Sequence, residues 1–203
     1  MLFNSALLIP FALFSLGLAH PEPEPTSPTP QEIVQPMATF EERCRPVADL
    51  IAKGEGDWNS VNRGRAGDTP RGIQSIIGKE FKEITVEQVL WLQRGSVYAV
   101  GRYQLIPSTM KLAVQWSKVS WSEKFTPQVQ DRLFCTLLSH KRPQVGRYLL
   151  GEGSLQHALD SLAKEWASVA YRGPYSYYSG IGGNRAHITV DEAAVALNKG
   201  RAL

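Results

Sequence analysis

The stretch Thr126-Pro-Gln-Val-Gln-Asp-Arg-Leu-Phe-Cys-Thr-Leu-Leu138 sets the pattern for most of the chain. Thr126 is a preferred N-cap residue, and Pro127 fits the first helical position, where no amide hydrogen is needed. Apolar side chains then recur three and four residues apart, at Val129, Leu133, Phe134, Leu137 and Leu138. This spacing predicts a helix with one buried face.

Similar start and stop signals recur on both sides of this segment. They predict further helices at 45–54, 85–95, 107–116, 154–166 and 189–197. The segment 96–106 is instead rich in β-branched and aromatic residues, which favours a small hairpin. We therefore expect an α+β fold that is mainly α, with a small β-hairpin region.

Composition and charge narrow the function classes. The chain has 203 residues, of which 43% are hydrophobic and 20% charged, as in an ordinary globular domain. The formal net charge is +3. Because residues 1–40 hold three Glu and no Lys or Arg, the rest of the chain carries +6, which suits a polyanionic partner. The basic residues are spread along the chain and form no stripe, so we expect no nucleic-acid partner.

The N-terminus resembles an export signal followed by a spacer. Residues 1–19 are mostly apolar and end in Gly17 and Ala19, a small-residue pattern that signal peptidase cuts. An uncleaved anchor is the alternative, since no Lys or Arg precedes the apolar run. Residues 20–39 are Pro-rich and predict an extended linker. The domain then spans 40–203. We expect a secreted or periplasmic monomer with no membrane span after signal removal.

Two cysteines, Cys44 and Cys135, remain in the expected domain. In an exported protein they predict one disulfide bond. It would close a loop of about 90 residues and stabilise the fold by about 4–5 kcal/mol at most. Two buried free thiols are the alternative. The four His are scattered, so we expect neither a metal nor another cofactor.

Three segments carry candidate chemistry. In Lys53-Gly-Glu-Gly56, Glu55 stands at the C-terminal end of a predicted helix, where the helix dipole and partial burial raise a carboxyl pKa. A protonated carboxyl group is what general-acid catalysis needs. The turn Arg102-Tyr103-Gln104 offers groups that hydrogen-bond and stack on a sugar. Each segment also has a plain structural explanation, as a solvated turn or a hairpin edge.

The third segment is the Gly/Pro-rich loop at 171–183, which contains the candidate sugar-binding residues Tyr171 and Tyr175. A surface loop packed on the core is the alternative. Asp68 and Thr69 are further candidate substrate-binding residues and end another polar, Gly-rich stretch. That stretch lacks the order of a phosphate-binding loop. No nucleophilic serine, catalytic cysteine or zinc-hydrolase motif occurs in the sequence.

The order of these segments resembles the lysozyme-like lytic transglycosylases typified by the endolysin of phage lambda. Four pieces match in register between about residues 44 and 187. They are a helix ending in Glu55-Gly56, the run Gly101-Arg-Tyr-Gln-Leu105, the run Phe125-Thr-Pro-Gln-Val-Gln-Asp131, and Trp166-Ala-Ser168 before a Gly/Tyr loop. The stretch 61–69 departs from the family pattern.

The resemblance implies a lysozyme-like fold and cleavage of the β-1,4 bond between N-acetylmuramic acid and N-acetylglucosamine in peptidoglycan. It implies that Glu55 is the single acid/base and that the product is a 1,6-anhydromuramic sugar. It also implies that Arg102, Tyr103 and Gln104 line the cleft.

Two alternatives stay open. A hydrolytic muramidase would use Glu55 with Asp68 or Asp57 as a second carboxylate, because the distance between two carboxylates decides between the mechanisms. A wall-binding module would keep the fold without activity.

Overall fold

The computed structural model describes residues 37–181 and 183–203, and these belong to one compact unit. The predicted signal peptide and residues 20–36 of the predicted linker lie outside the described residues.

The first helix, α1 (Phe40–Glu55), begins at a capping box. Thr39 and Glu42 form a capping box, in which each side chain binds the backbone amide of the other. The helix therefore starts at Phe40, five residues before the predicted Arg45, and Pro46 lies inside it. The capping box was the signal that the prediction missed.

Five other predicted helix starts are confirmed. Thr85, Thr126, Ser154 and Thr189 each accept a hydrogen bond from an amide in the first turn, and Pro107 opens the remaining helix. The helices are α3 (Val86–Leu92), α4 (Pro107–Trp116), α5 (Pro127–Thr136), α7 (Leu155–Ala163) and α8 (Val190–Arg201).

The sequence did not predict two short helices, α2 (Gln74–Ile77) and α6 (Pro143–Leu149). A π-helical turn at Leu137–Lys141 follows α5, so the apolar stripe predicted for α5 continues past its last α-helical residue. Single turns of 3-10 helix occur at Gly64–Ala66 and Phe81–Glu83. The four residues of α2 and the single 3-10 turns are too short to hold a full period of apolar residues, which is the main sequence signal of a helix.

The sheet corrects the predicted hairpin. It pairs β1 (Val61–Asn62) antiparallel with β2 (Ala99–Val100), so the partner strand comes from a distant segment. Only the tight turn from Val100 to Leu105 closes locally, through a single bridge. The described residues thus form a mainly helical fold with a small two-stranded antiparallel sheet, as expected for the fold class.

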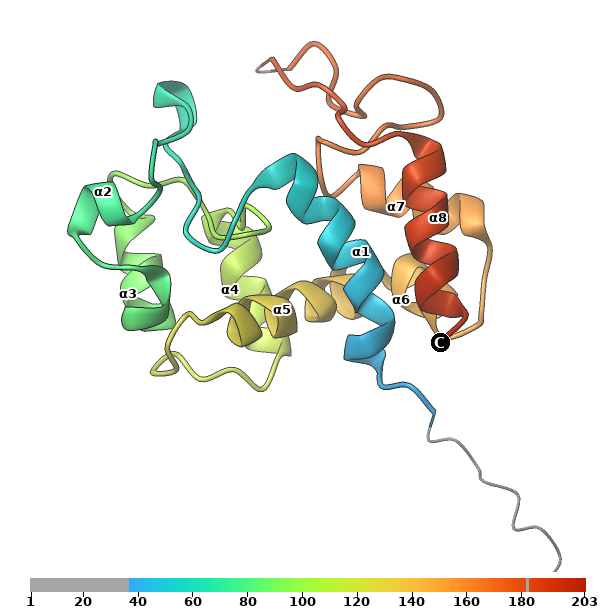
Figure 1. The fold of residues 1–203 in the computed structure, drawn as a ribbon, viewed down its shortest axis with the longest axis horizontal. Coiled ribbons are helices and arrows are strands. Elements are labelled where there is room, and N and C mark those ends of the chain that lie inside the picture. Colours follow the sequence, from blue (N-terminus) through green and yellow to red (C-terminus); the bar gives the residue numbers. More distant parts are fainter. Residues whose placement is uncertain (1–36, 182) are drawn as a thin grey trace, which may run out of the picture. The chain divides into compact units, whose positions relative to one another are not determined.

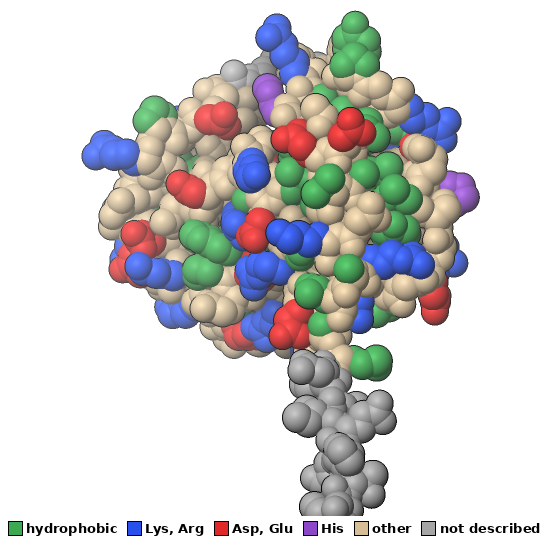
Figure 2. All heavy atoms as spheres, turned by 45° about the vertical axis from the view of Figure 1, so that its right-hand side comes forward, with side chains coloured by type: hydrophobic (Ala, Val, Ile, Leu, Met, Phe, Trp, Pro, Cys, Tyr) green, Lys and Arg blue, Asp and Glu red, His purple; other side chains and the backbone are tan. Residues whose placement is uncertain are grey.

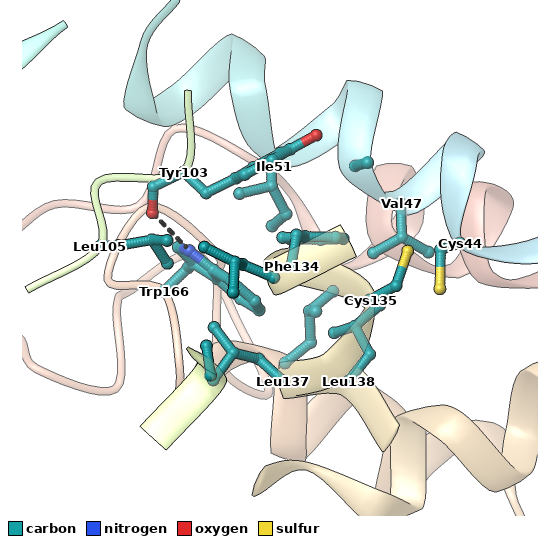
Figure 3. Close-up of a cluster of buried hydrophobic side chains, with 14 of the residues drawn as sticks. Cys44, Val47, Ile51, Tyr103, Leu105, Phe134, Cys135, Leu137, Leu138 and Trp166 are labelled. Carbon is teal, nitrogen blue, oxygen red and sulfur yellow. Dashed lines mark hydrogen bonds between the residues drawn. The ribbon is translucent and has the colours of Figure 1, made fainter. Parts of the chain in front are cut away.

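The helices pack around α1 and α5 (Figure 1). Helix α1 contacts α5 and α8, and α6 contacts both α7 and α8, whereas α4 joins α5 to α3. Between them lies a chain of aromatic contacts (Figure 3). Tyr103 stacks on Phe134 at 4.3 Å between ring centroids, and Phe134 contacts Trp166 at 5.0 Å. The Trp166 indole also donates to the backbone oxygen of Tyr103, which joins the segment after α7 to the turn after β2.

The two cysteines lie together in this core, Cys44 on α1 and Cys135 on α5 (Figure 3). Both are buried free thiols, so the predicted disulfide bond is not formed in this structure. Burial and the neighbouring Cys135 thiol raise the pKa of Cys44 well above its ordinary range. The Cys44 thiol therefore stays protonated, and both cysteines pack as small apolar groups.

The surface carries both signs of charge. On the face that Figure 2 shows, Lys and Arg side chains are interspersed with Asp and Glu and with hydrophobic side chains. Within residues 37–203, no helix has the length and apolar character needed to cross a bilayer.

Candidate functional site

Glu55 is the last residue of α1, as the sequence predicted for the end of that helix. The helix stops because Gly56 adopts a φ of 154°, a value that side-chain-bearing residues rarely reach, while its amide still bonds to the oxygen of Ala52. The carboxyl group of Glu55 is therefore held at a fixed point by a rigid helix.

Glycine at position 54 lets another segment approach Glu55. A Cβ atom on Gly54 would lie 2.8 Å from the Cβ atom of Ser168, which is closer than two carbon atoms can pack. Across this contact the Ser168 hydroxyl group donates a hydrogen bond of 2.5 Å to Oε1 of Glu55. The segment after α7 thus fixes the orientation of the carboxyl group.

The environment of Glu55 raises its pKa. Burial is the largest cause, because it penalises the charged form, and the negative charge of Asp68 adds to it. Hydrogen bonds from Ser168 and the electrostatic effect of His187 lower the pKa of Glu55, but burial outweighs them. Glu55 therefore keeps its proton to a higher pH than an ordinary glutamate, as a general acid must.

Glu55 lines a polar cavity of about 180 Å³. The cavity lies between the end of α1, the turn after β2, the π-helical turn and the segment after α7. Its other lining residues are Tyr103, Gln104, Leu105, Ile106, Thr109, Lys141, Arg142, Lys164, Glu165, Trp166, Ala167 and Tyr178.

Gln104 is one of two predicted binding residues that line the cavity with Glu55, and Tyr103 is the other. Gln104 takes the left-handed conformation, with a φ of 46°, which is uncommon for a residue with a side chain. Its side-chain amide donates to the backbone oxygen of Gly101 and lies 3.7 Å from the position that a Cβ atom on Gly56 would occupy. An amide group that lines the same cavity as the Glu55 carboxyl group is suited to hydrogen-bond a sugar.

Arg102 and Tyr103 are engaged in contacts within the protein. Arg102 does not line the cavity; it lies over the ring of Trp58 at 4.5 Å and pairs with Asp49 at 2.8 Å. Tyr103 lines the cavity, but its side chain is buried and its hydroxyl group donates to Asp131. Through these contacts both side chains stabilise the turn that contains Gln104.

The candidate carboxylates Asp57 and Asp68 have different surroundings. Asp57 accepts hydrogen bonds from the amide of Asn59 and the hydroxyl group of Ser60, so it stabilises its own turn. Asp68 is exposed, and one of its oxygens accepts from the side chain of Asn62. Of these two carboxylates, only Asp68 is among the charges that shift the pKa of Glu55. Thr69 continues this strand-like segment, with its amide bonded to the oxygen of Val61.

The tyrosine loop contributes a different residue from those predicted. Tyr175 is 70% exposed and lines a separate hollow, and Tyr171 is half-buried against the core; neither lines the Glu55 cavity. Tyr178 does line it, and its hydroxyl group donates to the backbone oxygen of Lys164.

Sequence reasoning did not select Ser168, His187 or Lys164. Ser168 belongs to the run Trp166-Ala-Ser168 that supported the resemblance, and this was the one available signal for its contact with Glu55. His187 comes near Glu55 because its amide bonds to the backbone oxygen of Ser168. Nothing in the sequence around position 187 indicates that contact.

No group of three or more His, Cys, Asp or Glu side chains is arranged to hold a metal ion in the described part of the chain. No protein-family model matches the sequence, and comparison with curated proteins gives no significant match. Any account of function therefore depends on the site itself.

Proposed function

We propose that this protein is an exported peptidoglycan-cleaving enzyme with a lysozyme-like fold, and specifically a lytic transglycosylase. The observation that carries the proposal is the state of Glu55, a half-buried carboxyl group with a raised pKa that faces a polar cavity beside Gln104. The order of sequence motifs that resembles the lytic transglycosylases supports the same assignment.

Glu55 would supply both proton transfers. Its protonated form would donate to the bridging oxygen between N-acetylmuramic acid and N-acetylglucosamine. The resulting carboxylate would then take the proton of the muramic acid 6-hydroxyl group while that oxygen attacks the anomeric carbon. The Ser168 hydrogen bond would keep the carboxyl group oriented in both steps. The product is a 1,6-anhydromuramic sugar, and no water is consumed.

Asp68 favours a second candidate function, that of a hydrolytic muramidase. Its negative charge acts on Glu55, and its side chain is exposed. A carboxylate that holds a water molecule opposite a general acid leads to hydrolysis. Asp57 is less suited to this part, because its carboxylate is occupied by its own turn.

Substitution of Glu55 tests the proposal. Glu55→Gln keeps the shape of the side chain and removes the transferable proton, so we expect loss of clearing of a peptidoglycan suspension. Glu152→Gln, an exposed change between α6 and α7, is the control and should act at the parent rate. If Glu55→Gln clears the suspension as fast as the parent, the proposal is wrong.

Mass spectrometry of the released fragments separates the candidates. Anhydro ends, lighter by one water than reducing ends, indicate a transglycosylase. Reducing ends that disappear in Asp68→Asn indicate a muramidase. Binding of the parent protein to wall sacculi without any soluble fragment indicates an inactive wall-binding module.

A further inference from the structure

Lys164 has an unusual position at the Glu55 cavity. It follows the last residue of α7, lines the cavity, and is half-buried. Its ammonium group lies 5.8 Å from the ring centre of Tyr171 and 5.5 Å from that of Tyr177. Neither tyrosine lines the cavity, so Lys164 connects the cavity to the tyrosine loop. Two aromatic rings within about 6 Å hold an ammonium group by cation–π attraction.

The charge of Lys164 is not neutralised by an ion pair among the described residues. The two nearest acids along the chain are both occupied. Glu165 accepts from Lys141 through one oxygen and from Arg142 through the other, at 2.6 and 2.7 Å. Asp160 feels the charge of Lys164, but its carboxylate is bound by Arg172.

The cavity therefore has an excess of positive charge. Lys141 and Arg142 share one carboxylate, that of Glu165, and Lys164 adds a further cation. Even with Glu55 counted as charged, the three cations outnumber the two carboxylates, Glu55 and Glu165, that line the cavity. An ammonium group on a half-buried residue, oriented by aromatic rings and neutralised by no ion pair, is suited to bind an anion.

We propose that Lys164, held by Tyr171 and Tyr177, binds a carboxylate of the substrate and makes the site select anionic over neutral glycan. The inference rests on the proposed function, because peptidoglycan is the polymer that brings such groups next to the scissile bond. Its carboxylates have two sources, which are the lactyl group of muramic acid that bears no peptide and the acidic residues of the stem peptides.

The test measures binding without cleavage, in the Glu55→Gln background. The probes are intact wall sacculi and sacculi whose carboxylates have been converted to amides. We expect Glu55→Gln to bind amidated sacculi about tenfold or more weakly, the effect of losing one charge-assisted contact. Adding Lys164→Gln should weaken binding to intact sacculi and remove the difference between the two probes. Lys164→Arg should restore the difference between the two probes. Lys111→Gln, an exposed change on α4, should leave that difference unchanged.

The outcomes distinguish the two proposals. If the Lys164→Gln double variant still discriminates between the probes, or if Glu55→Gln binds no sacculi, the assignment of Lys164 is wrong. Failure of the proposed function is seen separately, as a parent protein that releases no soluble fragments from sacculi. Sacculi stripped of their peptides by an amidase identify which carboxylate Lys164 binds. If binding to these sacculi still depends on Lys164, the carboxylate is that of the lactyl group. If binding no longer depends on Lys164, the carboxylate belongs to the stem peptide.

Discussion

The hydroxyl group of Ser168 donates to Oε1 of Glu55 although 113 positions separate the two residues in sequence. The hydrogen bond stabilises the charged form of the carboxyl group and so lowers its pKa, while burial raises it by more. The protonation of Glu55 is thus set by two opposing effects from different parts of the chain, and each can be changed separately.

Removing the Ser168 hydroxyl group should raise the pKa of Glu55 further. In Ser168→Ala burial and the backbone hydrogen bond from position 168 remain, and the side-chain hydrogen bond that lowers the pKa is lost. The alkaline limb of the activity profile should then move to higher pH, and so should the titration of the Glu55 side chain followed by carbon NMR. Ser179→Ala, in the exposed loop, is the matched control. A titration midpoint that stays the same or falls in Ser168→Ala would contradict this account.

Glu55 should also make the protein less stable at neutral than at acidic pH. A carboxyl group whose pKa is raised by folding binds its proton more tightly in the folded state. Its contribution to stability is complete below the ordinary pKa of 4.5 and is lost as the pH rises through the folded-state value. Glu55→Gln should therefore have a higher Tm than the parent at neutral pH. The difference should shrink on acidification, whereas Glu152→Gln should show no such trend.

Tyr103→Phe separates a structural role from a substrate contact. The change removes the hydroxyl group that donates to Asp131 and keeps the ring that stacks on Phe134. We expect the free energy of unfolding to fall by about 1–3 kcal/mol, the cost of a hydrogen bond to a charged group. Asp131 keeps its partner Arg45, so the fold should survive. Denaturant unfolding gives the loss, and an unchanged KM on wall polymer confirms the structural role. A KM that rises with no loss of stability would show that Tyr103 contacts substrate.

The thiol pair predicts a response to oxidation. Cys44 and Cys135 lie together in the core, so oxidation should join them with little rearrangement. Thiol titration of the unfolded protein should find two thiols after reduction and none after oxidation, and the oxidised form should have the higher Tm. The single variant Cys135→Ala should lose the redox dependence of Tm. Equal Tm values for oxidised and reduced parent protein would argue against a disulfide.

Local signals predicted most of the helices but not the strand pairing. The caps at Thr85, Thr126, Ser154 and Thr189 act within one turn of helix, so a few adjacent residues suffice to place them. The pairing of Val61 with Val100 depends on how distant segments pack, and two-residue strands are too short for a periodic pattern.

In the site, too, features set by neighbouring residues could be predicted, and contacts between distant segments could not. The raised pKa of Glu55 agrees in direction with the expectation from its place at a helix end, although burial is the main cause. Ser168 and His187 act on Glu55 through contacts between segments that no local pattern encodes. The turn 102–104 was predicted as a unit, but only the packed structure separates Gln104 at the cavity from Arg102 outside it.

The turn before Gln104 depends on the buried amide of Gln130. Its oxygen accepts from the amide of Arg102, and its nitrogen donates to the backbone oxygens of Trp58 and Phe125. Glycine at 101 is needed because a Cβ atom there would lie 2.4 Å from that oxygen. The neutral side chain of Gln130 therefore holds together the three loops that contain Trp58, Arg102 and Phe125. Attempts to graft the Glu55 site onto another scaffold, or to evolve its specificity in the laboratory, must carry this amide along with the groups that line the cavity.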